Sequence, residues 1–264
     1  AYREARRPSS VTSVRGIKIA ASAASASMTA ARRALALLLL ALLLLVSPSA
    51  GQSTTLLTET FDSGSGFTMT GSDGNAISAF FSDGYSDYLG INNGAGASCF
   101  SSACTDDPPS GAPAYTGFTG AYLEGEDLDG EGHSIPITLT WPTVSGSCAG
   151  MLVFSGKFAE DGSNHIDITG NTNFPPDFVK VEVAVDGGSA ATVLEFRGTQ
   201  RLASGYNGQF AVDTDGDGVG DGVVLGSAAQ TFTRAIPGTM GSSFALSVTI
   251  NVNAGNEEIA MDDF

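Results

Sequence analysis

Two segments of this chain alternate strictly between apolar and polar residues, and this alternation limits the possible folds more than any other feature. In Phe178–Val185, every second residue from Val179 to Val185 is a valine. In Phe244–Val252, every second residue from Phe244 to Val252 is likewise apolar. A period of two is typical of half-buried strands in antiparallel sheets. Both segments are therefore predicted strands with one face in a core.

Short runs of β-forming residues recur along the rest of the chain, separated by clusters of Gly, Asn, Asp and Pro. No stretch after Val46 has a helical period with caps. The sequence predicts an all-β protein, an antiparallel two-sheet β-sandwich of the jelly-roll kind. The expected strands are Thr55–Phe61, Ala76–Ser82, Ala121–Glu124, Ile135–Trp141, Met151–Ala159, Phe178–Val185, Thr192–Arg197, Thr231–Ile236, Phe244–Val252 and Glu257–Asp262.

Residues 28–51 have the pattern of an export signal. Met28–Arg33 is a short basic start, thirteen apolar residues follow from Ala34 to Val46, and small residues then lead to Gly51. A bilayer span needs about 20 residues, so a membrane anchor is the weaker alternative. We expect cleavage after Ala50 or Gly51 and a secreted or cell-surface protein. Residues 1–27 are either upstream sequence or part of a bipartite leader.

Residues 52–264 are expected to form one β-sandwich domain. The strand at Glu257–Phe264 has no polar tail after it, so we expect the natural protein to continue further.

The charge of residues 52–264 is strongly negative. The whole chain has 12 basic residues (Lys and Arg) and 28 acidic residues (Asp and Glu), and residues 1–51 contain seven of the basic residues and one of the acidic residues. Residues 52–264 therefore have five basic and 27 acidic residues, a net charge of −22. Such a surface repels phosphate backbones and anionic membranes and attracts cations.

Residues 92–117 predict a long exposed loop, which is either a binding surface or a tolerated insertion. Cys99 and Cys104 lie within it, and a disulfide between them is plausible in an exported protein. Cys148 bonding into the loop is the alternative. Because the chain has three cysteines, one thiol is left for an intermolecular disulfide or for self-assembly.

The sharpest motif is Asp213–Asp221, with carboxylates at relative positions 1, 3, 5 and 9 and glycine at position 6. Alternating aspartates on a tight turn resemble the front of a calcium loop, since Ca²⁺ takes six to eight oxygen ligands. The expected ligands are Asp213, Asp215, Asp217 and Asp221, with the carbonyl of Val219. Val224 stands where an EF-hand has glutamate. An acidic turn without an ion is the alternative.

A second calcium site is expected where the first and last strands of a jelly roll meet. Its expected ligands are Glu59, Asp62, Glu124, Asp127 and Asp262. A solvated acidic loop is the alternative for the part that lies in Glu124–Glu131.

Several blocks of this sequence together resemble a β-sandwich module of large secreted bacterial and marine proteins, often found beside lamin-tail domains or extracellular nucleases. The resemblance spans about Thr58 to Phe264 and implies a calcium-dependent surface or adhesion module rather than a catalytic unit. The cysteine-bearing loop departs from the family pattern, which leaves the ligand open. The blocks are Ala121–Gly132, Ile137–Thr140, Phe154–Glu160, Phe178–Gly188, Val212–Gly222 and Glu257–Phe264.

An enzyme is not expected. Glu124, Glu126 and Asp129 have the spacing of the carboxylates in glycan-cleaving jelly rolls, but Glu and Asp are interchanged at the last two positions, and Gly125 and Gly130 suggest a loop. His133 and His165 show no zinc pattern. Trp141 is expected in the core rather than as a sugar-stacking platform.

The sequence therefore predicts a secreted, Ca²⁺-binding module with a structural or adhesive role, whose partner is an extracellular glycan or protein of a cell coat or matrix. The alternatives are a carbohydrate-binding or polysaccharide-cleaving jelly roll and an accessory domain of a secreted hydrolase. No nucleic acid and no membrane insertion are expected.

Overall fold

The computed structural model describes residues 53–62, 66–82, 87–92, 115–129, 132–146, 151–161, 166–168, 175–199, 207–236, 241–254 and 257–264. The chain divides into two units, Ala1–Thr54 and Thr55–Phe264. The described elements belong to the second unit and are all strands. No helix in the described part of the chain is long and apolar enough to cross a membrane.

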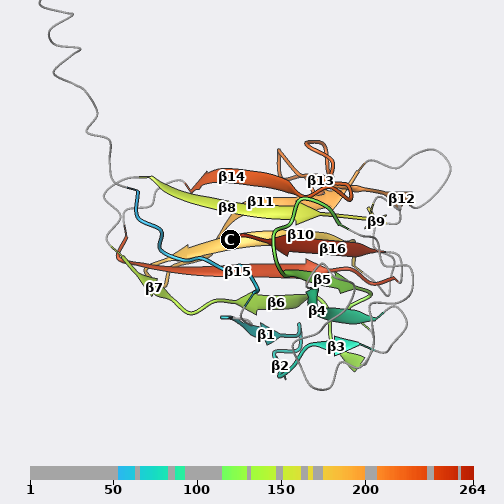
Figure 1. Ribbon diagram of the computed structural model, residues 1–264, viewed down its shortest axis with the longest axis horizontal. Coiled ribbons are helices and arrows are strands. Elements are labelled where there is room, and N and C mark those ends of the chain that lie inside the picture. The colour runs from blue at the N-terminus through green and yellow to red at the C-terminus, as the bar shows by residue number, and fades with distance from the viewer. Residues whose placement is uncertain are drawn as a thin grey trace, which may run out of the picture. The chain divides into compact units, whose positions relative to one another are not determined.

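Two antiparallel sheets form the domain (Figure 1). In the eight-stranded sheet the order is β13 (Phe210–Val212), β11 (Ala191–Gly198), β10 (Phe178–Val185), β15 (Ser243–Asn251), β6 (Ile137–Thr140), β1 (Thr68–Thr70) and β2 (Ala76–Ile77), and β7 (Val144–Ser145) also pairs with β15. In the six-stranded sheet the order is β14 (Gln230–Ile236), β8 (Leu152–Ala159), β16 (Glu258–Asp262), β5 (Tyr122–Glu126), β4 (Tyr88–Asn92) and β3 (Phe81–Ser82). A short pair, β9 (Ile166–Asp167) and β12 (Asn207–Gly208), is separate.

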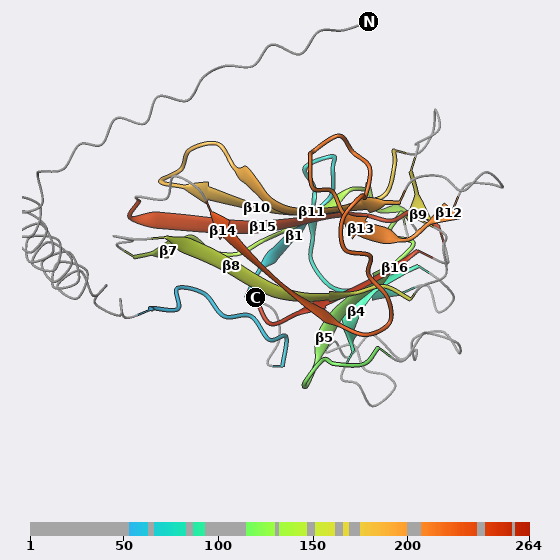
Figure 2. The ribbon, with the colours of Figure 1, turned by 90° about the horizontal axis from the view of Figure 1, so that it is seen from above.

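The two sheets lie one over the other, with β10 and β15 in one layer and β8 and β16 in the other (Figure 2). Aromatic side chains from both sheets meet between the layers. Phe158 of β8 and Phe196 of β11 have ring centroids 4.9 Å apart, and both side chains are fully buried. The fold is the predicted antiparallel two-sheet β-sandwich.

The two segments with alternating apolar residues, in β10 and β15, bury the apolar face that the sequence predicted. In β10, Val179, Val181 and Val183 are buried in the core, and the residues between them are more exposed. In β15, Val248 and Ile250 are fully buried in the same core. The two strands pair in register, with Val179 opposite Ile250 and Val181 opposite Val248. Their shared apolar face therefore covers the centre of the sandwich.

Two of the expected strands differ from the structure. Thr55–Phe61 has no strand geometry, although Glu59 pairs with the last residue of the chain through backbone hydrogen bonds. Ala76–Ser82 is not one strand but two, because β2 belongs to the eight-stranded sheet and β3 to the six-stranded sheet. The short strands β1, β4, β7, β9, β12 and β13 were not expected. They have only two to five residues each, too few for a clear period.

Candidate cation-binding sites

The aspartate loop follows β13 and brings three of its expected ligands together. Carboxylate oxygens of Asp213, Asp215 and Asp217 all lie within 4.8 Å of one another. Asp213 accepts backbone N–H groups from Gly216 and Gly218 at 2.7 and 2.9 Å. Gly216 and Gly218 have φ values of 78° and 88°, which side-chain-bearing residues rarely adopt. These two glycines let the loop turn around the first aspartate.

Asp221 lies at the neck of this loop rather than among the three clustered carboxylates. Its Oδ1 accepts hydrogen bonds from the backbone N–H and the hydroxyl of Thr214, at 2.9 and 2.7 Å. These bonds favour the ionised form and lower the pKa of Asp221. The backbone of the loop is anchored to β11, since the N–H groups of Asp213 and Gly220 donate to the carbonyls of Glu195 and Gly198. It is also anchored to β13, since the N–H of Asp221 donates to the carbonyl of Val212. Backbone hydrogen bonds therefore hold the loop that carries the carboxylate cluster against the eight-stranded sheet.

Glu59 has donors for both of its carboxylate oxygens. Its Oε1 accepts the N–H of Phe61 at 3.0 Å. Its Oε2 accepts the N–H of Gly66 at 3.1 Å and the indole Nε1–H of Trp141 at 3.0 Å. Trp141 is only 2% exposed, so it is the core residue that the sequence predicted. Glu59 therefore belongs to this hydrogen-bond network and is not part of the expected second calcium site.

Asp62 and Asp262 do lie together, near the point where Glu59 pairs with Phe264. Asp262 is fully buried, and neither of its carboxylate oxygens has a well-formed hydrogen bond among the described residues. Burial raises the pKa of Asp262 to about 7, and the neighbouring charges of Asp263 and Asp62 add to this. Asp62 accepts the N–H of Ala121 at 2.8 Å. Two oxygens without donors beside a second carboxylate are suited to a cation.

Gly120 allows Asp62 to reach this position. A Cβ atom at Gly120 would lie 2.2 Å from Asp62 Oδ1, and the φ of Gly120 is 90°. Only glycine fits such a close approach in this conformation.

The other two expected ligands of the second site lie elsewhere. Glu124 is on β5, beside Glu258 and Asn92. Asp127 follows β5 and lies near Asp87 and Asp129; burial, followed by these two neighbours, raises the pKa of Asp127 to about 8. The expected five-residue site is thus distributed over four places, and only Asp62 and Asp262 share one. A turn after β5 separates Asp127 from Glu124, and the sequence alone did not show this direction change.

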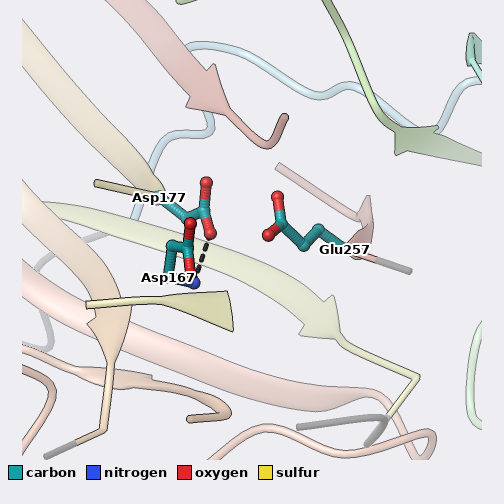
Figure 3. A group of neighbouring side chains, drawn as sticks. All are labelled: Asp167, Asp177 and Glu257. Carbon is teal, nitrogen blue, oxygen red and sulfur yellow. Dashed lines mark hydrogen bonds between the residues drawn. The ribbon is translucent and has the colours of Figure 1, made fainter. Parts of the chain in front are cut away.

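A third group of carboxylates was not found from the sequence. Asp167 of β9, Asp177 before β10 and Glu257 before β16 have carboxylate oxygens within 4.8 Å of one another. Figure 3 shows the carboxyl groups of Asp177 and Glu257 facing each other. Asp177 Oδ2 accepts the N–H of Asp167, and Asn253 donates to both Asp177 and Glu257, at 2.8 and 2.7 Å.

Burial dominates the electrostatics of this third group. It raises the pKa of Asp177 to about 10, with the charge of Glu257 as the next cause, and that of Glu257 to about 7. Burial also raises the pKa of Asp167. Carboxyl groups this close need either protons or a cation between them. Glu257 is far in the chain from Asp167 and Asp177, so no sequence spacing could have revealed the group.

Glu124 and Glu126 are on a strand and not in the loop that Gly125 had suggested. Both point to the outer face of the six-stranded sheet, and both are buried. Gly125 lies on the opposite face, where a Cβ would come within 3.0 Å of Leu89 and 3.2 Å of Leu128. The glycine therefore serves close packing in the core.

The expected disulfide cannot be placed, because Cys99, Cys104 and Cys148 lie outside the described residues. His165 and the export signal at residues 28–51 also lie outside them. His133 is described and packs against Phe81, with ring centroids 4.3 Å apart.

The fold and these sites define an antiparallel β-sandwich with several groups of converging carboxylates in its described part. No protein-family model matches the chain, and no curated protein matches it. Among solved structures, it is similar to the K1 cleaved adhesin domain of Lys-gingipain from Porphyromonas gingivalis, with 14% identity and a TM-score of 0.40 over 80% of this chain and 96% of that one. The K3 cleaved adhesin domain of the same protein gives 13% identity and a TM-score of 0.41 over 80% and 97%.

The absence of catalysis, the link to lamin-tail or nuclease proteins, secretion and calcium binding all stay predictions.

Proposed function

We propose that this chain is an extracellular, calcium-stabilised β-sandwich module with an adhesive or structural role in a cell coat or matrix. The partner is an extracellular glycan or protein. The export pattern at residues 28–51 supports the location, and the charge of −22 after it supports binding of cations.

The observation that carries the calcium part is the convergence of Asp213, Asp215 and Asp217. Like charges this close repel one another, and a divalent ion removes the repulsion. Hard carboxylate oxygens are the ligands that Ca²⁺ prefers, and extracellular modules typically bind it in the range of ~0.1–1 mM. Because β11 and β13 anchor the loop, an ion there would tie the loop to the eight-stranded sheet.

Isothermal titration of the full chain with CaCl₂ tests this proposal. We expect binding in that range, and we expect it to weaken strongly in the double variant Asp215→Asn, Asp217→Asn. Asp73→Asn is the matched control, because Asp73 is an acidic residue in a turn, bonded to Asn75. Equal calcium binding by the double variant and the wild type would contradict a site in this loop.

The adhesive part is tested on an array of extracellular glycans and matrix proteins, with fluorescently labelled full chain. We expect retention in 10 mM CaCl₂, about ten times the weak end of the binding range, and release in excess chelator. Retention that is identical in both conditions would separate adhesion from calcium, and absence of retention in both would contradict the adhesive role.

The polysaccharide-cleaving alternative gains no support from the position of its candidate acid. Glu124 is 2% exposed, so a sugar could not reach it in this conformation. We expect the full chain to release no reducing sugar from a panel of algal and bacterial glycans. Release that Glu124→Gln abolishes would establish the alternative.

A further inference from the structure

The group of Asp167, Asp177 and Glu257 brings together three separate parts of the domain. Asp167 is on β9, which pairs with β12 outside both large sheets. Asp177 directly precedes β10 of the eight-stranded sheet, and Glu257 directly precedes β16 of the six-stranded sheet. A ligand held by all three side chains would therefore connect the β9–β12 pair to both sheets of the sandwich.

The carboxylate oxygens of this group are spaced for one calcium ion. They all lie within 4.8 Å of one another. Two oxygens on opposite sides of a Ca²⁺ ion are about 4.6–5.2 Å apart, which is twice the usual Ca–O distance. Asp177 is fully buried and Glu257 is 1% exposed, and Figure 3 shows their carboxyl groups facing each other.

Several oxygens of the group lack hydrogen-bond donors. Asp167 donates its backbone N–H to Asp177, but its own carboxylate accepts no hydrogen bond among the described residues. In Glu257, Oε2 accepts the N–H of Asn253 at 2.7 Å, whereas Oε1 has no well-formed hydrogen bond in the same part of the chain. Because buried polar atoms are nearly always paired with protein, water or an ion, these oxygens indicate a bound ligand.

A buried amide beside the group also has an oxygen without a donor. Asn251 is fully buried, and its Nδ2 donates to the carbonyl of Pro176 at 3.0 Å, while its Oδ1 has no hydrogen-bond partner. Asn253 lies between this amide and the carboxyls, since its Nδ2 is 3.4 Å from the Pro175 carbonyl, as is that of Asn251, and donates to Asp177 at 2.8 Å. Amide oxygens are among the ligands that Ca²⁺ takes.

No basic residue in the described part of the chain forms an ion pair with these three carboxyls. The basic side chains of β10 and β11 bond other carboxylates, Lys180 to Glu182 and Arg197 to Glu195. Arg197 also lies over the ring of Phe178, 4.6 Å from its centroid. Three carboxylates at this distance, without a basic partner, repel one another, and a divalent cation would remove the repulsion.

We infer that Asp167, Asp177 and Glu257 together bind one Ca²⁺ ion, which fastens the β9–β12 pair to both sheets. The ion accepts the carboxylate oxygens that have no donor and offsets their charge. Without it, the like charges favour separation of β9 from the starts of β10 and β16. This site is distinct from the aspartate loop and does not depend on calcium binding there.

Hydrogen exchange of the full chain, read by mass spectrometry, tests this site. Exchange is compared in excess chelator and in 10 mM CaCl₂, about ten times the weak end of the calcium range of extracellular modules. Openings that release the ion become rarer by a factor of one plus the ratio of free calcium to the dissociation constant, which is roughly 10- to 100-fold over the ~0.1–1 mM range. We expect calcium to slow exchange by this factor in peptides that contain Asp167, Asp177 and Glu257.

Asp167→Asn removes one ligand charge and keeps the N–H that bonds Asp177. We expect this variant to lose the effect of calcium around the group and to keep any effect in residues 213–221. The double variant Asp215→Asn, Asp217→Asn should keep the effect around the group. Asp73→Asn is the matched control and should behave as the wild type at both places.

In chelator, Asp167→Asn should exchange no faster than the wild type, because it has one like charge fewer. Faster exchange there would give Asp167 a purely structural role and contradict the inference. Equal wild-type exchange in calcium and chelator around the group overturns it, and so does an undiminished calcium effect in Asp167→Asn, which would place the ion elsewhere. If the variant does not fold, calcium titration of the wild-type amide resonances decides, because an ion here must shift those of Asp167 and Glu257. Slower exchange in residues 213–221 alone would contradict this site and leave the aspartate loop supported.

Discussion

Glu59 and Phe264 pair through both of their backbone groups, which joins the beginning of the domain to its end. The N–H of Glu59 donates to the carbonyl of Phe264 at 2.9 Å, and the N–H of Phe264 donates to the carbonyl of Glu59 at 3.0 Å. The ring of Phe264 contacts Phe61 and Trp141, with centroids 5.9 and 5.5 Å apart. The segments around Glu59 and Phe264 are therefore part of the core, and changes there should affect the stability of the whole sandwich.

We expect Glu59→Ala to destabilise the fold by about 2–5 kcal/mol, because it leaves two buried donors without an acceptor. These donors are the N–H of Phe61 and the indole N–H of Trp141. Glu59→Gln keeps one acceptor oxygen and should cost less. Urea denaturation of the full chain measures both values. A loss below about 0.5 kcal/mol for Glu59→Ala, the usual size of a surface effect, would mean that the network contributes little.

Calcium should raise the melting temperature of the full chain. At a free calcium concentration one hundred times the dissociation constant, binding to the folded state alone raises the free energy of unfolding by about 2.7 kcal/mol. In a domain of this size that is a shift of several degrees. Asp215→Ala together with Asp217→Ala should remove most of the shift and leave the β-rich circular dichroism spectrum intact. Equal melting temperatures in chelator and in calcium would show that the aspartate loop is only an acidic turn.

In chelator, Asp262 should make the fold less stable as the pH rises from about 4 to about 7. Its pKa is raised to about 7 in the folded state, so the folded state binds the proton more tightly than the unfolded state does. Stability is therefore highest while the carboxyl is protonated and falls as it ionises. Asp262→Asn should flatten this part of the profile of unfolding free energy against pH. An unchanged slope in the variant would assign the dependence to other carboxyls.

The secreted form should begin at Gly51 or Gln52. Cleavage after Gly51 has the small residues Ser49 and Gly51 at the two recognition positions, whereas cleavage after Ala50 has the less suitable Pro48 at one of them. The apolar run before them has the length of an export signal. N-terminal sequencing of protein recovered from the medium of its native source measures this. Recovery of secreted chains that still begin with Ala1 would contradict the prediction.

The sequence by itself determined the strands that make up most of both sheets. Phe178–Val185 has the same bounds in the structure, and Phe244–Val252 differs from β15 by one residue at each end. Alternation determines these strands because one side of each must be apolar to lie on the core, whatever its neighbours are. The convergence of Asp213, Asp215 and Asp217 was predictable from the sequence, since these residues are close in the chain and local turns bring them together, whereas Asp221 lies apart from them.

Tertiary structure alone decided which distant carboxyls share a site. Glu124 and Asp262 both follow recognisable patterns, yet strand register places Glu124 beside Glu258 and leaves Asp262 beside Asp62. Asp167, Asp177 and Glu257 meet only because the end of β9 lies beside the starts of β10 and β16. Local sequence patterns encode which face a residue takes, whereas the partner on that face is set by how the strands are ordered in the sheets. That order depends on contacts between residues far apart in the chain, which no local pattern records.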